Sequence, residues 1–427
     1  MLFNKTLISI GAIVLGMTTS LVNSSPSSSD NEKFQSKRST MLSKVFGKRD
    51  CNFDCGSNGI PDCDSRCQNS GVDKFLVSAC VGGKCYCGFD PSITLVTQIM
   101  PKVIGTHSGH FHCDEALAVW MLKQTKDFQG ASLVRTRDPS KLAECNVVVD
   151  VGGVYDPAQH KYDHHQRGFT ETFDDKHATK LSSAGLVYKH FGREVIANLL
   201  KKPETAEDVE TIYQKTYNDF IESLDANDNG ISAYPNTLTP LFKESPTSLA
   251  QRVGQKNPSW NETLTDPEVD ERFVSASDMA GSELAGFVEA MANSWLPARS
   301  LVVDALEKRD QVNASGRVIA LERSCPWKEH LMDLEKERGL EGDNNILYVL
   351  YPESSPEGNW RIQCVPTRPQ GFENRKSLPE SWRGYRDQEL SEISKVDGCI
   401  FVHAGGFIGG NKSRHGAYEM ARLALEL

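Results

Sequence analysis

The chain has 427 residues, of which 39% are hydrophobic and 24% are charged, and its formal net charge is −10 at pH 7. This length is enough for two ordinary domains, each with a hydrophobic core of its own. The acidic balance excludes a protein that is basic over its whole surface, so any contact with nucleic acid must use a local patch.

The first residues, up to Ser25, are typical of a secretory signal. Lys5 precedes the apolar run LISIGAIVLG, and the small residues that follow are suitable for a cleavage site. The run is too short to predict a membrane span, so we expect no stable insertion into a membrane. Residues 26–49 are rich in serine and end in the dibasic pair Lys48-Arg49, which predicts a disordered pro-segment.

Seven of the twelve cysteines fall within residues 50–90, and the other five are scattered over the rest of the chain. The first group indicates a disulfide framework, whereas the second is typical of thiols in a reducing compartment. The spacing of Cys63 and Cys67, with Cys85 and Cys87 after them, resembles the helix-and-hairpin scaffold of defensin-like secreted peptides. That resemblance implies that the first pair bridges to the second. Zinc binding is the alternative, although no CxxC pair is present.

Met100 stands just before the first strand of a new domain. Our hypothesis is that residues 1–99 are a fused or mis-joined secreted peptide and that the α/β protein natively starts near Met100. Peptides of the native protein that span residues 88–101 would contradict this hypothesis.

A strand, a polar loop and a helix follow one another between Lys102 and Leu122, in the sequence KVIGTHSGHFHCDEALAVWML. Open α/β sheets place their ligands in such loops, at the carboxyl ends of strands. Imidazoles and a carboxylate in one loop suit a transition metal such as Mn²⁺ or Zn²⁺ better than Ca²⁺. The alternative is a surface loop rich in histidine. The candidate residues of the loop are His107, His110, His112 and Asp114.

Two more polar segments follow predicted strands. The run NVVVDV, residues 146–151, predicts a buried β-branched strand that ends at Asp150, and the two glycines after it predict a turn. Residues 160–168, HKYDHHQRG, predict a short strand that leads into Asp163, His164 and His165. Residues 133–137 predict a further strand between the first loop and these two.

Helical patterns fill the region that follows. Ser182 is suited to cap a helix through Leu200, and apolar residues at helical spacing predict a core helix over residues 206–224. The second helix ends in DANDNG, which puts Asp225 and Asp228 at a helix C-terminus. The helix dipole disfavours acids there, so a nearby cation would account for them. The alternative is a simple Asx-Gly stop signal.

The pattern along the rest of the chain predicts two domains, over residues 100–305 and 312–427. Residues 232–262 indicate a long surface excursion, residues 269–295 a helix, and residues 299–316 a break in the pattern at the domain boundary. The predicted elements of the second domain are a strand over 318–321, a hairpin of 346–350 with 360–364, a strand over 399–403, and a helix over 417–427.

Acids and imidazoles therefore follow three predicted strands, and one more carboxylate comes from a helix end. In a parallel sheet these loops converge on one edge, so residues far apart in sequence can share a metal cluster. Two metal ions about 3.5–4 Å apart, bridged by a carboxylate, could hold both an attacking water and a phosphoryl oxygen. Such a site needs no serine or cysteine nucleophile.

Five motifs then occur in order along the chain: HSGHFHCDEA, VVVDVGG, YDHHQRGF, LDANDNG and HAGGFIGGNKSR. Together they resemble the MYG family of the DHH phosphoesterase superfamily, whose relatives include RecJ-type exonucleases and manganese pyrophosphatases. The resemblance covers the chain from about residue 100 to its C-terminus. It implies a parallel-sheet α/β domain with a site for two Mn²⁺ or Mg²⁺ ions, followed by a smaller α/β substrate-binding domain.

The resemblance also implies roles for individual residues. Asp150 would bridge the two metals, and His164 and His165 would bind metal or the scissile phosphate, with Asp163, His164 and His165 as the catalytic motif. His112 stands where the superfamily usually has an acid, and His110 is expected to be structural. The implied metal ligands are His107, His112, Asp114, Asp150, Asp163 and Asp225.

The glycine-rich loop near the C-terminus is a candidate for substrate binding. Glycines let backbone N–H groups approach phosphate oxygens, and basic side chains add charge. An ordinary turn is the alternative, and a basic face that simply contacts water is equally expected for each neighbouring arginine. The candidate residues are His403, Gly405, Gly406, Gly409, Gly410, Lys412 and Arg414.

Three functions are compatible with these observations. The resemblance implies a metal-dependent 3′–5′ exoribonuclease of mitochondria and nucleus that takes single-stranded RNA. The same site would also suit a pyrophosphatase or a small-nucleotide phosphoesterase. The secretory N-terminus favours a different class, a secreted Cys-rich binding protein with an inactive passenger domain.

Overall fold

The computed structural model describes residues 77–81, 84–88 and 102–427, apart from Asn236, Pro240, Glu244 and Glu341. Residues 1–101 and 102–427 form two units, and each is described by itself. In the first unit, β1 (Val77–Val81) and β2 (Lys84–Gly88) pair as an antiparallel hairpin. The predicted signal and pro-segment lie outside the described residues, and so do Cys63 and Cys67 of the predicted disulfides. Among the described helices, none has both the length and the apolar character needed to cross a bilayer.

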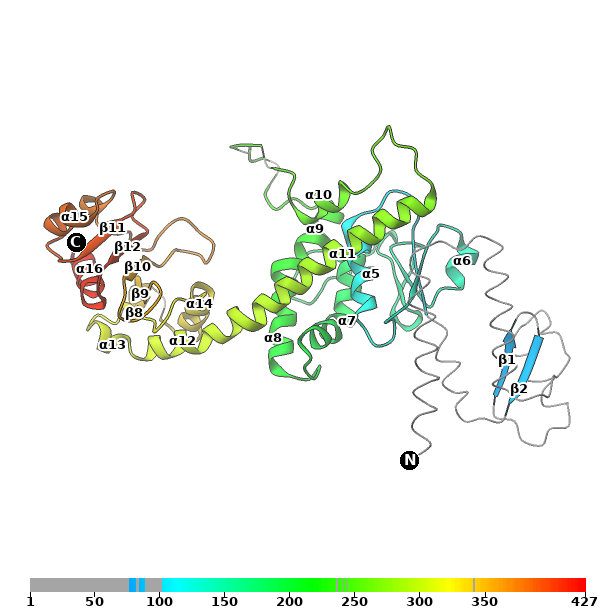
Figure 1. The fold of residues 1–427 in the computed structure, drawn as a ribbon, viewed down its shortest axis with the longest axis horizontal. Coiled ribbons are helices and arrows are strands. Elements are labelled where there is room, and N and C mark those ends of the chain that lie inside the picture. Colours follow the sequence, from blue (N-terminus) through cyan, green and yellow to red (C-terminus); the bar gives the residue numbers. More distant parts are fainter. Residues whose placement is uncertain are drawn as a thin grey trace, which may run out of the picture. The chain divides into compact units, whose positions relative to one another are not determined.

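The second unit contains a mainly parallel five-stranded sheet with the strand order β4-β3-β5-β7-β6. The sheet lies between α5 and α6 in Figure 1. Four neighbouring strands run parallel, and β6 at one edge is antiparallel. The segments after β3, β5 and β7 therefore meet at one edge, and the predicted parallel sheet is confirmed. Its strands are β3 (Val103–Thr106), β4 (Ser132–Arg135), β5 (Val147–Val149), β6 (Tyr155–Asp156) and β7 (Lys161–Tyr162).

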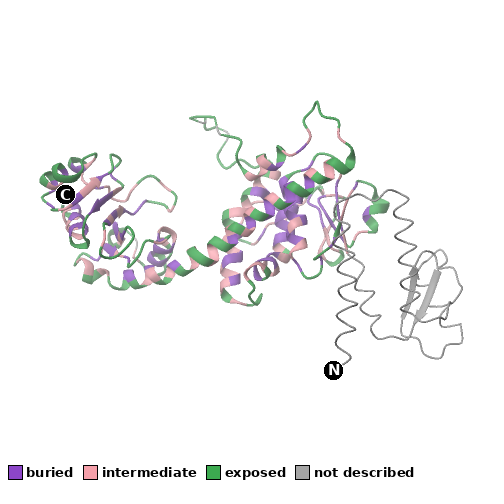
Figure 2. Ribbon diagram, viewed as in Figure 1, coloured by how far each residue is buried: buried purple, intermediate pink, exposed green. Residues whose placement is uncertain are grey.

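Three helices pack together beside this sheet and form the first core: α5 (Cys113–Lys123), α7 (Ser183–Leu200) and α11 (Asp266–Ala290). Figure 2 shows the buried residues concentrated where these helices meet. The almost uninterrupted apolar sequence of α5 is explained by its burial on nearly all sides. Gly281 of α11 has no side chain because an added Cβ would overlap the indole of Trp120 on α5.

The predicted core helix over residues 206–224 is present but longer than expected. α8 (Glu207–Thr216) passes through a π-helical turn, η3 (Tyr217–Ile221), into α9 (Glu222–Asp228). Asp225 therefore lies inside the helix, and Asp228 is its last residue. The remaining short helices of this lobe are α6 (Pro139–Ala143), η2 (Pro157–Gln159) and α10 (Leu249–Gly254).

The predicted helix over residues 269–295 is confirmed, but the predicted break over 299–316 is wrong. After α11, the π-helical η4 (Met291–Trp295) leads directly into α12 (Leu296–Glu307), and α13 (Arg309–Val312) follows. Val302 and Leu306 of α12 are fully buried in a separate core with the C-terminal strands. The helix continues because the C-terminal lobe covers its apolar side.

The C-terminal lobe is built on a second five-stranded sheet with the order β11-β12-β10-β9-β8. The predicted hairpin is confirmed, because β9 and β10 pair antiparallel. The strands are β8 (Val318–Ala320), β9 (Tyr348–Pro352), β10 (Trp360–Cys364), β11 (Cys399–Val402) and β12 (Ile408–Asn411). The helices are α14 (Lys328–Glu337), η5 (Gly342–Asn344), η6 (Glu380–Trp382), α15 (Asp387–Ser394) and α16 (Arg414–Glu426).

Candidate metal centre

A cavity of about 790 Å³ opens at the carboxyl edge of the first sheet. The segments after β3, β5 and β7 line it, together with the first turn of α5 and the last turn of α9. Within this region, three overlapping groups of acids and imidazoles place potential ligand atoms within 4.8 Å of one another. The sequence therefore brings side chains from four separate segments to one place.

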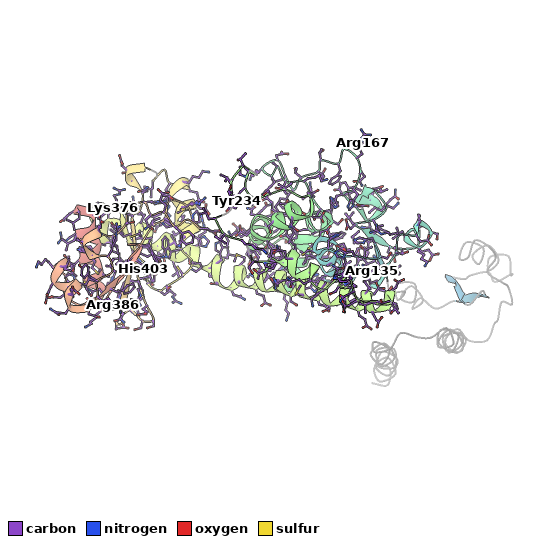
Figure 3. All side chains as sticks on the ribbon, turned by 90° about the horizontal axis from the view of Figure 1, so that it is seen from above. Arg135, Arg167, Tyr234, Lys376, Arg386 and His403 are labelled. Carbon is purple, nitrogen blue, oxygen red and sulfur yellow. The ribbon has the colours of Figure 1, made fainter. Side chains whose placement is uncertain are left out.

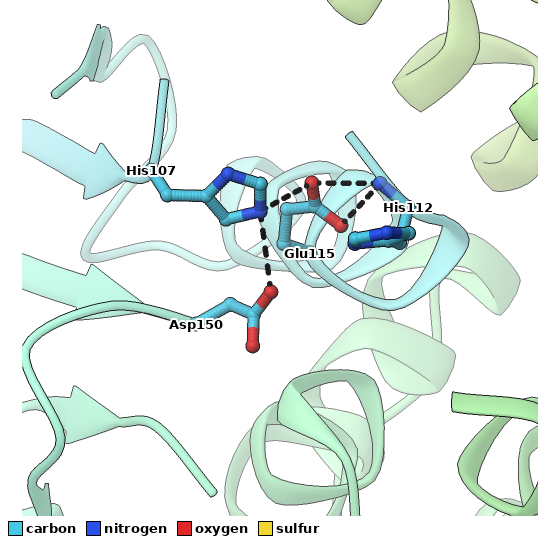
Figure 4. Close-up of side chains that lie close together, drawn as sticks. All are labelled: His107, His112, Glu115 and Asp150. Carbon is cyan, nitrogen blue, oxygen red and sulfur yellow. Dashed lines mark hydrogen bonds and ion pairs between the residues drawn. The ribbon is translucent and has the colours of Figure 1, made fainter. Parts of the chain in front are cut away.

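The first group consists of His107, His112, Glu115 and Asp150 (Figure 4). Nε2 of His107 lies 3.0 Å from a Glu115 oxygen and 3.4 Å from an Asp150 oxygen. Glu115 is not among the residues predicted from the sequence. Its carboxylate accepts the backbone N–H of His112 at 2.9 and 3.0 Å, so it also caps the start of α5. A glutamate three residues after the last loop histidine is the available sequence signal for such a cap.

Asp150 is the residue that the first two groups share. It has a φ of 57°, a left-handed conformation that aspartate adopts more readily than most residues and that is frequent at functional sites. Its Oδ1 accepts a hydrogen bond from Ser183 at the start of α7. Burial would raise the pKa of Asp150, but His107 and His164 outweigh this effect and hold it well below the usual range.

The second group adds His164 and His165 to Asp150. Nε2 of His164 lies 3.4 Å from Asp150 and 3.0 Å from Asp228, and the ring is buried. The side chain of His165 is 61% exposed, so it faces the open cavity rather than the core. His164 therefore lies among the acids, whereas His165 is accessible to a substrate.

Asp163 lines the cavity but belongs to none of the three groups. One of its oxygens accepts the backbone N–H of Gly153 at 2.6 Å. The other accepts the backbone N–H of His165 at 3.0 Å and lies 2.8 Å from Nδ1 of the His165 ring. The structure thus gives Asp163 the contacts of a residue that orients His165.

The third group consists of His112, Asp114 and Asp228. Asp114 is 1% exposed, and neither of its carboxylate oxygens has a hydrogen-bond donor among the described residues. Burial and the nearby carboxylates of Asp150 and Asp228 raise the pKa of Asp114 well above its usual value. A buried acid without donors needs a cation or a proton. These residues therefore fit a divalent metal ion.

Asp225 is buried in the same helix as Asp228 but does not join any of the groups. Its Oδ1 accepts from the backbone N–H and hydroxyl of Ser182 and from the backbone N–H of Gly185, and its Oδ2 accepts from Tyr217. Burial raises the pKa of Asp225 to about 7, although these four donors oppose that effect. The Asp225 carboxylate therefore holds the start of α7 in place. Asp228, rather than Asp225, belongs to one of the three groups.

The loop that carries His107 and His112 is held by two side chains, one from the end of β4 and one from the segment after α10. Nη2 of Arg135 donates to the carbonyl of Gly109 at 2.7 Å. Asn257 forms two hydrogen bonds with the backbone of Phe111, accepting its N–H at 2.9 Å and donating to its carbonyl at 2.7 Å. These contacts hold the loop in one conformation. His110 lines the cavity and belongs to none of the three groups.

The pKa values of the two buried histidines, His107 and His164, are higher than that of an ordinary imidazole. Burial lowers the pKa of His107, but its contacts with Asp150 and Glu115 raise it to about 9. Burial likewise lowers the pKa of His164, and the facing carboxylates of Asp150 and Asp228 raise it to about 9. Protons on these rings balance part of the negative charge that metal ions would otherwise balance.

The predicted substrate loop lies in the C-terminal lobe, between β11 and α16. Gly409 and Gly410 are buried within β12, where added Cβ atoms would crowd Phe401 and Arg361. Close packing of the strand explains these two glycines. Gly406 is buried with a φ of 66°, which a turn there requires. The remaining candidates, His403, Gly405, Lys412 and Arg414, are exposed, and His403 is labelled in Figure 3.

A parallel sheet whose loops gather acids and imidazoles into overlapping groups defines this chain as an α/β protein with a candidate metal centre. A family model described as "Uncharacterised protein family (UPF0160)", the MYG1 exonuclease family, matches residues 103–425. The chain belongs to this family. The predicted membership of the MYG family is confirmed, and its place in the DHH superfamily stays a prediction.

Three relatives illustrate the likeness. The MYG1 exonuclease of Bos taurus is 50% identical over 331 residues, which cover 76% of this chain and 85% of that protein. The MYG1 exonuclease of Homo sapiens is 49% identical over 331 residues, covering 76% and 86%. A MYG1 protein of Saccharomyces cerevisiae is 46% identical over 330 residues, covering 76% and 96%.

Proposed function

We propose that this protein is a metal-dependent phosphodiester hydrolase, a 3′–5′ exoribonuclease that uses two divalent ions. The observation that carries the proposal is the set of three overlapping ligand groups, in which Asp150 and His112 are each shared by two groups. Shared ligands suit two ions held close together, as in two-metal phosphoryl-transfer sites. Relatives named exonuclease over the same range support a nuclease.

The donor set favours Mn²⁺ over Mg²⁺. The three groups contain four imidazoles, and imidazole suits transition metals, whereas Mg²⁺ prefers oxygen ligands and waters. When bound, two such ions would supply Lewis acidity at the phosphoryl oxygen and lower the pKa of an attacking water. The ligand residues we assign are His107, His112, Asp114, Asp150, His164 and Asp228. They differ from the set predicted from the sequence in that His164 and Asp228 take the places of Asp163 and Asp225.

The residues outside the ligand set have separate tasks. Asp163 holds the His165 ring through Nδ1, so Nε2 of His165 is the nitrogen available to the cavity. An imidazole in that position can exchange a proton with the leaving oxygen. Arg135 and Asn257 keep the ligand loop rigid, which limits reorganisation when the substrate binds.

The test combines metal analysis with degradation of end-labelled RNA by the full chain. We expect bound Mn²⁺ in the purified protein, and shortening of single-stranded RNA from its 3′ end that stops when EDTA is added. Asp150→Asn should lose both metal and activity. Asp175→Asn, at an exposed acid outside the cavity, is the matched control and should lose neither. Activity that survives EDTA, or hydrolysis of pyrophosphate but not RNA, would contradict the proposal.

A further inference from the structure

The metal cavity contains two cations that no acid neutralises. Its described lining carries five imidazoles and four carboxylates, but only two permanently positive side chains, Arg137 and Lys180. Neither takes part in a salt bridge between described residues. The neighbouring Arg135, in contrast, forms a salt bridge with Asp270 and donates a hydrogen bond to the carbonyl of Gly109. Two unpaired cations in a cavity indicate a ligand with negative charge.

Arg137 lies beside the outer nitrogen of a metal-ligand histidine. Its guanidinium is 3.2 Å from Nδ1 of His107, and the same nitrogen is 3.3 Å from the carbonyl of Ser108. Nε2 of His107 faces Glu115 and Asp150. A ligating histidine usually donates its other N–H to a carbonyl or carboxylate, and Ser108 offers a carbonyl. That arrangement leaves the guanidinium of Arg137 without an acceptor among the described residues.

Lys180 lies on the opposite side of the cavity. Its carbonyl accepts a hydrogen bond from Asn229 at 2.8 Å, and its ammonium stands 5.8 Å from the ring centre of Phe169. Phe169 packs edge-on against Tyr155 of β6. Lys180 is therefore at the β6 and β7 side of the sheet, whereas Arg137 follows β4 at the other side.

We propose that Arg137 and Lys180 bind backbone phosphates of a single-stranded nucleic acid on the two sides of the metal centre. The inference rests on the proposed function and names two residues that would bind its substrate. Three strand intervals separate β4 from β7, roughly 14 Å in all. A polynucleotide carries a negative charge at every step and can contact both cations.

The test measures how salt weakens binding of a short single-stranded RNA with phosphorothioate linkages, which resist hydrolysis. Each phosphate contact made by a cation contributes about 0.7 to the slope of log affinity against log salt. We expect Arg137→Gln and Lys180→Gln each to reduce the slope by about 0.7, and the double variant by about 1.4. Their metal content should match that of the unchanged protein.

Two kinds of control separate a phosphate contact from other roles. Arg167→Gln and Lys176→Gln remove exposed cations of the same lobe that lie outside the cavity, and they should leave the slope unchanged (Arg167 is labelled in Figure 3). Arg137→Lys keeps the charge but not the planar guanidinium. It should keep the slope, because a lysine also displaces one counterion from a phosphate.

Unchanged slopes in both cavity variants would overturn the inference, and so would a loss of metal from Arg137→Gln, since that residue would then only position His107. If the unchanged protein shortens RNA in either case, the proposed function survives and only this inference fails. If the unchanged protein binds no single-stranded RNA, the proposed function fails as well.

Discussion

Asp225 and Asp228 lie one helical turn apart in α9, yet their carboxylates have different partners. Asp225 accepts four hydrogen bonds that fasten the start of α7 and Tyr217. Asp228 stands 3.0 Å from Nε2 of His164, in the group with His112 and Asp114. A single turn of helix thus separates a residue that secures the fold from one that faces the cavity.

This difference predicts opposite results for two matched variants. Asp228→Asn should lose bound metal, because its carboxylate belongs to a ligand group with His112 and Asp114. Asp225→Asn should keep the metal but lower the free energy of unfolding by about 1–3 kcal/mol, because an amide leaves one of the buried donors unmatched. Metal analysis and urea denaturation of both variants check the prediction. Loss of metal from Asp225→Asn alone would restore the role first predicted for it.

The surroundings of Asp114 predict that this ligand residue destabilises the metal-free protein. Its two buried oxygens have no donor among the described residues, and three other carboxylates are close to it. Asp114→Asn removes the need for a cation or a proton and adds an N–H that can donate to Asp228. We expect the free energy of unfolding of the metal-free variant to be about 1–2 kcal/mol higher than that of the unchanged protein. Added Mn²⁺ should stabilise the unchanged protein more than the variant in thermal melts. A less stable metal-free variant would contradict this account.

The arrangement of the first sheet was predictable because local patterns determine it. Short apolar runs that end in acids or imidazoles predict strands with polar loops, and β3, β5 and β7 follow this pattern. The prediction of a break over residues 299–316 was wrong because long-range contacts, rather than local patterns, stabilise the helix there. α12 is stabilised by contacts of Val302 and Leu306 with the second core, and such long-range burial leaves little trace in a short window of sequence.

The detail of the metal centre was harder to predict than its location. The spacing in LDANDNG allowed either acid to face the sheet, and the π-helical turn before α9 changes which side of the helix each residue occupies. Glu115 is hidden in an apolar run, where a glutamate in the first helical turn is most simply interpreted as a cap. Sequence spacing cannot settle these choices, because they depend on the helix phase and on which donors surround each carboxylate.

The contact between Asp163 and His165 predicts a kinetic rather than a binding defect. Asp163 touches the His165 ring and the backbone of Gly153, and it belongs to none of the ligand groups. Asp163→Asn should therefore keep its metal and its affinity for RNA while kcat falls by about 10²–10⁴-fold, the usual contribution of a positioned acid or base. Single-turnover kinetics and metal analysis test this. A variant that loses metal would place Asp163 among the ligands after all.

The close approach of α5 and α11 predicts opposite effects of two glycine substitutions in one helix. Gly281→Ala puts a methyl group against the indole of Trp120 and should destabilise the protein by about 1–3 kcal/mol. Gly286→Ala meets no atom within 4 Å and should stabilise it by about 0.5–1 kcal/mol, as expected of alanine in an exposed helix. Urea denaturation compares the two. Equal effects would show that the helices are less tightly packed than the structure indicates.

The raised pKa values of His107 and His164, both about 9, predict that metal binding releases protons. At pH 7 both rings are protonated in the metal-free protein, and a metal ion must displace each proton to reach the ring nitrogen. Affinity should therefore rise with pH, by up to about tenfold per pH unit for each proton, and level off near pH 9. Ordinary histidines would level off near pH 6.5. Calorimetric titration with Mn²⁺ in buffers of different ionisation enthalpy counts the protons, and pH-independent affinity above pH 7 would contradict the prediction.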